Sequence, residues 1–87
     1  MVKLDKKNRE SYKKLVLDEL RDGKEEEFRK TFLDLHPSDQ SDIFSNLDAS
    51  ARTRVYTYIT PEEFAEVFGG LIISDQKLIY LELDEDY

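Results

Sequence analysis

Acidic side chains gather at two points of this sequence, and they are the side chains best placed to do chemistry. Asp39 and Asp42 lie three positions apart, and Glu63 and Glu66 repeat that spacing 24 residues later, with Glu62 beside them. Neighbouring carboxylates repel one another unless a cation or a basic partner binds to them. A divalent cation such as Mg²⁺ suits this pattern, because it keeps most of its waters and binds through one or two carboxylates. A solvated acidic face that binds nothing explains the same residues and stays open.

Other catalytic and metal-binding chemistries have little support in the sequence. The 87 residues include no Cys and a single His, which leaves neither a nucleophile with its base nor a set of zinc ligands. His36 precedes Pro37 at the expected start of a helix, where we expect it to cap or pack. Gly69-Gly70 lacks the Lys and Ser/Thr of a phosphate-binding loop. We therefore expect no enzymatic activity.

The net charge of −7 is unevenly distributed. Residues 1–30 hold ten Lys/Arg and eight Asp/Glu, whereas residues 31–87 hold three and twelve. Nucleic-acid binding requires a clustered cationic surface, so the sequence predicts no nucleic-acid partner. Apolar runs are no longer than Leu78–Leu81, far below the roughly 20 residues that span a bilayer, so we expect no membrane insertion by this chain.

A twelve-residue period runs through most of the chain. Its aromatic positions are Phe32, Phe44, Tyr56, Phe68 and Tyr80. A β-branched aliphatic residue precedes four of the five, and another aliphatic residue follows each of them by three positions. Side chains at i, i+1 and i+4 share one stripe of a helix. The period therefore predicts repeated helices of about two and a half turns, with the aromatic column in the core.

Helix-start and helix-stop residues place the boundaries. Thr60-Pro61-Glu62-Glu63 reads as a capping box, Asp48 as an N-cap and Gly23 as a helix stop. The pattern predicts helices over residues 6–21, 25–35, 37–46, 49–58, 61–69 and 75–83. The first helix is expected to bury Tyr12, Leu15, Val16 and Leu20. Residues 70–82 also fit two short strands around a turn, an alternative that stays open.

Short helices with tight connections must bury their stripes on neighbours, which predicts an all-α stack of antiparallel helices of the α-solenoid type. Helices 24 residues apart share a layer, so the acidic pairs would form one negative face. Arg52 and Arg54 would then lie on the opposite, weakly positive face. A further helix is expected to begin near Asp84, so the array would be truncated at its C-terminal end.

Residues 24–87 resemble the cytosolic N-terminal domain of MgtE-type magnesium transporters. The motifs that carry the resemblance are His36-Pro37-x-Asp39, Ala65-Glu66-Val67 and Leu83-Asp84-x-x-Tyr87. Segment 32–35 precedes the first motif, and segments 42–44, 47–48 and 60–63 follow it in order. Residues 1–23 match only as a generic leading helix. The resemblance implies a right-handed superhelix.

The resemblance also implies a regulatory role on the cytoplasmic side of the plasma membrane. In that family the domain precedes a pair of CBS domains and a membrane channel, within a homodimer. Magnesium bound between the N-terminal and CBS domains holds the cytosolic assembly compact and the pore shut. When magnesium falls, the carboxylates repel one another and the pore can open, a population shift driven by a ligand.

The resemblance places a magnesium contact at Glu66, and it includes Asp39 and Glu63 as shared motif residues at helix starts that could also bind the ion. We take Glu66 as the contact and Asp42, Glu62 and Glu63 as secondary candidates. The main acidic cluster of the family lies past Tyr87, so magnesium binding by this chain alone is expected to be weak or absent. The alternative function is an α-solenoid scaffold for protein–protein interaction, resembling flagellar-motor switch domains. There the acidic face would contact a protein, with no role for a metal.

Overall fold

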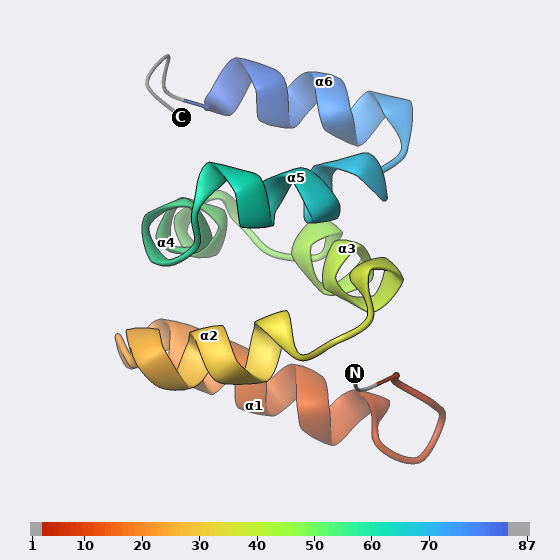
Figure 1. Ribbon diagram of the computed structural model, residues 1–87, viewed down its shortest axis with the longest axis vertical. Coiled ribbons are helices and arrows are strands. Elements are labelled where there is room, and N and C mark those ends of the chain that lie inside the picture. Colours follow the sequence, from red (N-terminus) through yellow and green to blue (C-terminus); the bar gives the residue numbers. More distant parts are fainter. Residues whose placement is uncertain (1–2, 84–87) are drawn as a thin grey trace.

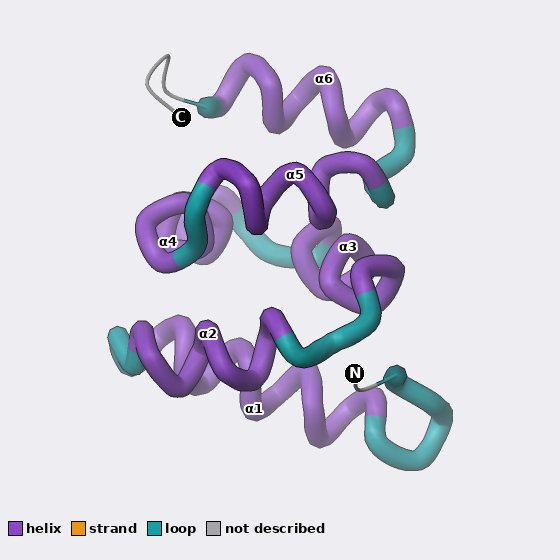
Figure 2. Tube along the Cα trace, viewed as in Figure 1, coloured by secondary structure: helices purple, strands orange, loops and turns teal. Residues whose placement is uncertain are grey.

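The computed structural model describes residues 3–83, which fold into six α-helices and no strands. The helices are α1 (Arg9–Arg21), α2 (Glu25–Leu33), α3 (Pro37–Ser45), α4 (Ala49–Tyr58), α5 (Pro61–Gly69) and α6 (Ile73–Glu82). Their connections are short throughout (Figure 2). The all-α prediction is confirmed, and most of residues 70–82 form α6, from Ile73 to Glu82, rather than two strands. The predicted helix near Asp84 and the motif ending at Tyr87 lie outside the described residues.

The helices are stacked as consecutive pairs along the longest dimension of the molecule, which is 36 Å (Figure 1). The α1–α2 pair forms one end, α3 and α4 lie in the middle, and α5 and α6 form the other end. In this view α3 and α4 are seen nearly end-on, whereas the other helices run across the picture. The middle pair therefore crosses the pairs on either side of it at a steep angle. Helix α2 contacts α4, and α3 contacts α5. These pairs are 24 residues apart, as the repeat predicts; the right-handed twist stays a prediction.

Helices α4 and α5 begin at the N-cap residues that the sequence predicts, Asp48 and Thr60. Asp48 Oδ1 accepts a hydrogen bond from the Ala51 amide at 2.8 Å. Thr60 Oγ1 accepts from the Glu63 amide at 3.1 Å, and Glu63 Oε1 accepts from the Thr60 amide at 2.7 Å. This reciprocal pair is the predicted capping box, and it satisfies two amides that a helix start would otherwise leave unpaired.

The other two predicted boundary residues behave as expected. His36 Nδ1 accepts from the Ser38 amide at 3.1 Å, so the histidine caps α3. Gly23 has a φ of +71°, a left-handed conformation that a residue without Cβ adopts readily. It therefore ends α1 and lets the chain reverse into α2.

The aromatic column is buried only in part. Phe32 and Phe44 are fully buried, Tyr56 and Phe68 are half-buried, and Tyr80 is 75% exposed. The prediction is therefore wrong for Tyr80. Interior positions are covered by the helix two places further along, and among residues 3–83 no such helix follows α6. The β-branched aliphatic residue that precedes four of the five aromatics is buried in each case, at Ile43, Val55, Val67 and Ile79.

The first helix differs from the prediction in two respects. It begins at Arg9 instead of residue 6, because Asp5 Oδ1 accepts hydrogen bonds from the backbone amides of residues 7 and 8 and holds a turn. Leu15 is 47% exposed and was expected in the core. The buried stripe runs through Val16 and Leu20, four residues apart, and Leu15 is rotated about 100° away from it.

Candidate functional site

Two of the predicted magnesium contacts lie exposed on α5. Glu62 and Glu66 are four residues apart, so their side chains leave the helix on neighbouring parts of one face. Within residues 3–83 neither carboxylate takes part in an ion pair. The structure therefore leaves both available to a cation or a partner.

Glu63, the third candidate, is bound by an arginine of α2. Arg29 Nη1 and Nη2 donate to Glu63 Oε1 and Oε2 at 2.7 and 2.8 Å, and Arg29 Nη1 also donates to the Tyr58 carbonyl at 2.9 Å. These arginine hydrogen bonds are the main reason that the pKa of Glu63 lies below its ordinary value. With the Thr60 cap added, both carboxylate oxygens are occupied. Glu63 joins α5 to α2.

Asp42, the fourth candidate, also faces a cation, since Lys13 Nζ of α1 lies 3.5 Å from its Oδ2. Its neighbour Asp39 is buried, and its Oδ2 accepts from the Leu4 amide at 2.9 Å. The predicted negative face is therefore reduced, because Lys13 and Arg29 pair with Asp42 and Glu63, and Asp39 is buried. Across residues 3–83, no three Asp, Glu, His or Cys side chains gather as metal ligands would.

The predicted weakly positive face is reduced, because one of its two arginines, Arg52, is paired with a carboxylate. Arg52 Nε and Nη2 donate to the two oxygens of Glu82 at 3.0 and 2.8 Å, joining α4 to α6. The Tyr56 hydroxyl donates to Glu82 Oε1 at 2.8 Å. Arg52 is the main cause of the lowered pKa of Glu82, while burial is the main cause of the raised pKa of Tyr56. Arg54 Nη1 donates to the Leu20 and Arg21 carbonyls, each at 2.9 Å.

Sequence reasoning missed the Arg52–Tyr56–Glu82 group, although one signal was present. Arg52 lies one helical turn before Tyr56, on the stripe that the period assigns to the core. A charged residue on such a stripe needs a partner that shares its burial. Nothing local identifies Glu82 as that partner, since it lies 30 residues further along the chain.

The pH dependence of stability should reveal the Glu63 link. Because its folded pKa is lowered from the ordinary 4.5, its contribution is complete above about pH 4.5 and is lost as the pH falls through the folded value. We expect Glu63→Gln to lose less stability than wild type between about pH 6 and pH 3, measured by urea unfolding. Glu62→Gln, which removes a carboxylate that joins no ion pair within the described residues 3–83, should retain the wild-type slope. Identical slopes for Glu63→Gln and wild type would contradict the assignment.

Comparison with known proteins gives a partial match. Over 54 residues the chain is 37% identical to the magnesium transporter MgtE of Enterococcus faecalis (strain ATCC 700802 / V583). The match covers 62% of this chain and 12% of that transporter, so the chain spans a small part of the relative's length. No family profile and no solved structure matches the chain. In residues 3–83 no helix has both the length and the apolar character needed to cross a membrane.

Proposed function

We propose that this chain is a cytosolic regulatory domain of a magnesium transporter and takes part in sensing magnesium. The observation that carries the proposal is the 54-residue similarity to MgtE. The stack of short helices is compatible with that similarity, since it offers exposed side chains on a rigid support. In this function the domain catalyses no reaction; it responds to the ion that the transporter carries.

Glu66 and Glu62 are the residues that suit magnesium. Both are exposed carboxylates on one face of α5, whereas Glu63 is held by Arg29 and Asp42 lies beside Lys13. Magnesium is bound in many proteins by one or two carboxylates, with water completing its octahedron. Two carboxylates on one helix supply part of such a site, so binding by this chain alone would be weak. Further ligands would come from a neighbouring domain of the parent transporter, and we propose a CBS domain in this role because the resemblance implies one.

Such a shared site would regulate by shifting a conformational equilibrium. A cation between two acidic surfaces favours the state in which the surfaces are close, and its loss leaves like charges to repel. The domain would then move away from its neighbour and relieve the constraint on the membrane channel of the homodimer. The role of this chain's residues is limited to presenting Glu62 and Glu66 on a helix fixed by the Arg29–Glu63 link.

A magnesium titration of the longer transporter tests the proposal. We expect Glu66→Gln to raise the magnesium concentration that protects the interdomain linker from protease by about tenfold, the equivalent of 1.4 kcal/mol. The matched control is Glu10→Gln, an exposed carboxylate at the start of α1, which should leave the midpoint unchanged. An unchanged midpoint for Glu66→Gln would exclude that residue from the site.

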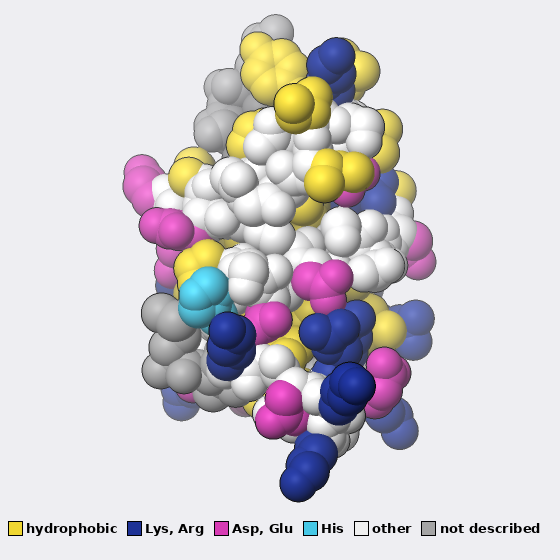
Figure 3. Space-filling view, turned by 90° about the vertical axis from the view of Figure 1, so that its right-hand side faces the viewer, with side chains coloured by type: hydrophobic (Ala, Val, Ile, Leu, Met, Phe, Trp, Pro, Cys, Tyr) yellow, Lys and Arg dark blue, Asp and Glu magenta, His cyan; other side chains and the backbone are white. Residues whose placement is uncertain are grey.

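The α-solenoid scaffold remains a second candidate, because α6 exposes an apolar face. Figure 3 shows hydrophobic side chains at the end of the molecule that α6 forms and Lys and Arg side chains toward the opposite end. The exposed apolar residues of α6 are Ile73, Leu78, Tyr80 and Leu81, with Ile72 directly before the helix. Exposed apolar patches are typical of protein interaction sites. If the wild-type linker shows no magnesium-dependent protection, the scaffold is the better description.

A further inference from the structure

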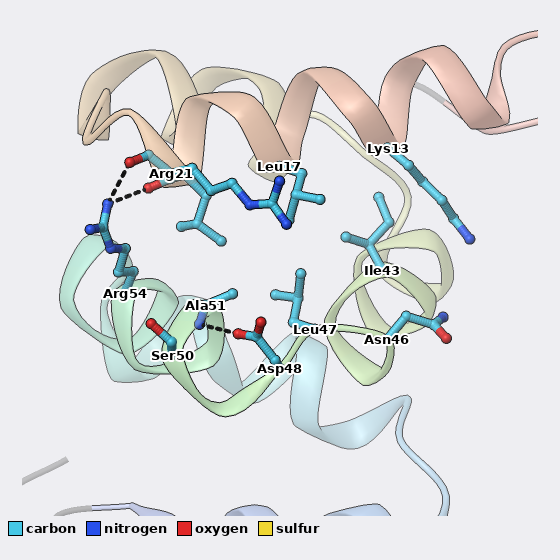
Figure 4. A pocket seen from close by; sticks show the side chains of 11 residues that line it. Lys13, Leu17, Arg21, Ile43, Asn46, Leu47, Asp48, Ser50, Ala51 and Arg54 are labelled. Carbon is cyan, nitrogen blue, oxygen red and sulfur yellow. Dashed lines mark hydrogen bonds between the residues drawn. The ribbon is translucent and has the colours of Figure 1, made fainter.

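A cleft between α1 and the α3–α4 junction is not explained by the proposed magnesium contacts. Its volume is about 340 Å³. Figure 4 shows Leu17, Ile43 and Leu47 on its walls, with α1 on one side and the starts of α4 and the loop before it on the other. Aliphatic side chains that line a cleft open to water favour an apolar occupant, because covering them removes apolar surface from solvent.

Cationic side chains surround these aliphatic side chains, Leu17, Ile43 and Leu47, which we call the floor of the cleft. Lys13, Arg21 and Arg54 all line the cleft, and Arg21 extends across it in Figure 4. Arg54 is fixed there by its hydrogen bonds to two carbonyls at the end of α1. Asp48 is the acidic residue of the lining, and its Oδ1 is engaged in capping α4. In a chain of net charge −7, the cleft is a local site of positive charge.

We propose that this cleft binds an acidic amphipathic segment of a partner protein, which places an aliphatic side chain on the floor and carboxylates against the cations. The apolar floor disfavours an inorganic anion, which would gain nothing from Leu17 or Leu47. The acidic net charge disfavours nucleic acid, whose phosphates need a larger cationic surface. Charge of opposite sign at the rim attracts and orients an acidic peptide, and the floor then supplies buried apolar contact.

The polar side chains that line the cleft come from α1 on one wall and from α4 and the loop before it on the other. Arg21 belongs to the last turn of α1, where it is exposed, and within residues 3–83 it has no carboxylate partner. Lys13 lies two turns earlier on the same helix, about 12 Å away along its axis, and its Nζ is 3.5 Å from Asp42 Oδ2 of α3. Arg21 is therefore the cation of α1 that is left to pair with a carboxylate of a bound segment. Ser50, at the start of α4, adds a hydroxyl at the opposite wall. A short amphipathic helix can place a carboxylate beside Arg21 and an aliphatic side chain on Leu17 and Leu47.

Fluorescence anisotropy with the 87-residue chain tests this inference. The probe is a fluorescein-labelled helical peptide of about twelve residues built from Glu, Leu and Ala. EDTA is present to remove any contribution from magnesium. We expect a Kd on the order of 100 µM, and we expect the Kd to rise as the salt concentration is raised. Arg21→Glu should weaken binding at least about tenfold, because it reverses a charge at the rim. Arg9→Glu, an equally exposed change on α1 outside the cleft, should bind like wild type.

A second variant and two further probes distinguish the alternatives. Ser50→Tyr, at an exposed position that lines the cleft, should block the peptide while leaving the helical circular dichroism unchanged. A peptide with Lys in place of each Glu should not bind. Equal affinity for that peptide, an unaffected Arg21→Glu variant, or displacement by millimolar inorganic phosphate alone would overturn the proposal. None of these results depends on magnesium, so the proposed sensing function is tested independently.

Discussion

Replacing Phe44 by Ala is expected to lower the free energy of unfolding by about 3–5 kcal/mol. The Phe44 side chain is fully buried in α3. Its ring centroid lies 5.8 Å from that of Tyr56 and 5.2 Å from that of Phe64, so it connects α3 to α4 and α5. The truncation removes these ring contacts and leaves a cavity in the middle of the stack. Urea unfolding followed by circular dichroism at 222 nm measures the loss.

Tyr80→Ala is the matched control, since Tyr80 occupies the same position three repeats later. Because its side chain is 75% exposed, we expect a change within about 0.5 kcal/mol. Phe68→Ala should fall between the two, because Phe68 is half-buried. Similar losses at Phe44 and Tyr80 would show that position in the repeat, and not burial, determines the contribution of each aromatic.

Gly70→Ala is expected to destabilise the protein by about 1–3 kcal/mol through overpacking. A Cβ on Gly70 would overlap Ser41 Oγ on α3. Ser41 cannot move aside freely, because its hydroxyl is 2.7 Å from the Val67 carbonyl and 3.1 Å from the Pro37 carbonyl. The close approach of α3 to the end of α5 therefore requires a residue without a side chain at position 70.

Gly69→Ala provides the comparison one residue earlier. A Cβ at Gly69 would meet no atom within 4 Å. Gly69 is the last residue of α5, and its φ is negative, so alanine can adopt its backbone conformation. We expect a gain of about 0.4–1 kcal/mol, because Ala restricts the unfolded chain. Thermal unfolding of both variants measures the difference. Equal stability of the two alanine variants would show that α3 can shift away from α5 at little cost.

Local chemistry explains why the helix starts could be predicted. Asp48, Thr60 and His36 each bond an amide two or three residues further on, so the evidence for the cap is contained in a short segment. The 24-residue relation between contacting helices also follows from the period, because equal repeats place equivalent faces at equivalent depths. The class of fold was therefore accessible from the sequence.

Which acidic residues are paired with a cation could not be predicted from the sequence in the same way. Glu63 binds Arg29, 34 residues earlier, and Asp42 faces Lys13, 29 residues earlier. Lys13 lies in α1, before the repeat begins, and Arg29 lies in α2 at a position that the period does not specify. Their approach depends on how steeply the helix pairs cross, which no spacing in the sequence specifies. Glu62 and Glu66, which have no such partner within residues 3–83, retain the exposure that the sequence predicted.

The Arg29–Glu63 link has a consequence for how the stack unfolds. In a linear array of repeats each unit contacts its immediate neighbours, and the ends can open independently of the middle. Here one carboxylate both begins α5 and ties it to α2, with Arg29 adding a bond to the last residue of α4. Opening α5 therefore breaks contacts in three helices at once. This tie favours cooperative melting of α2 through α5, and the Arg52–Glu82 pair joins α6 to that unit through α4.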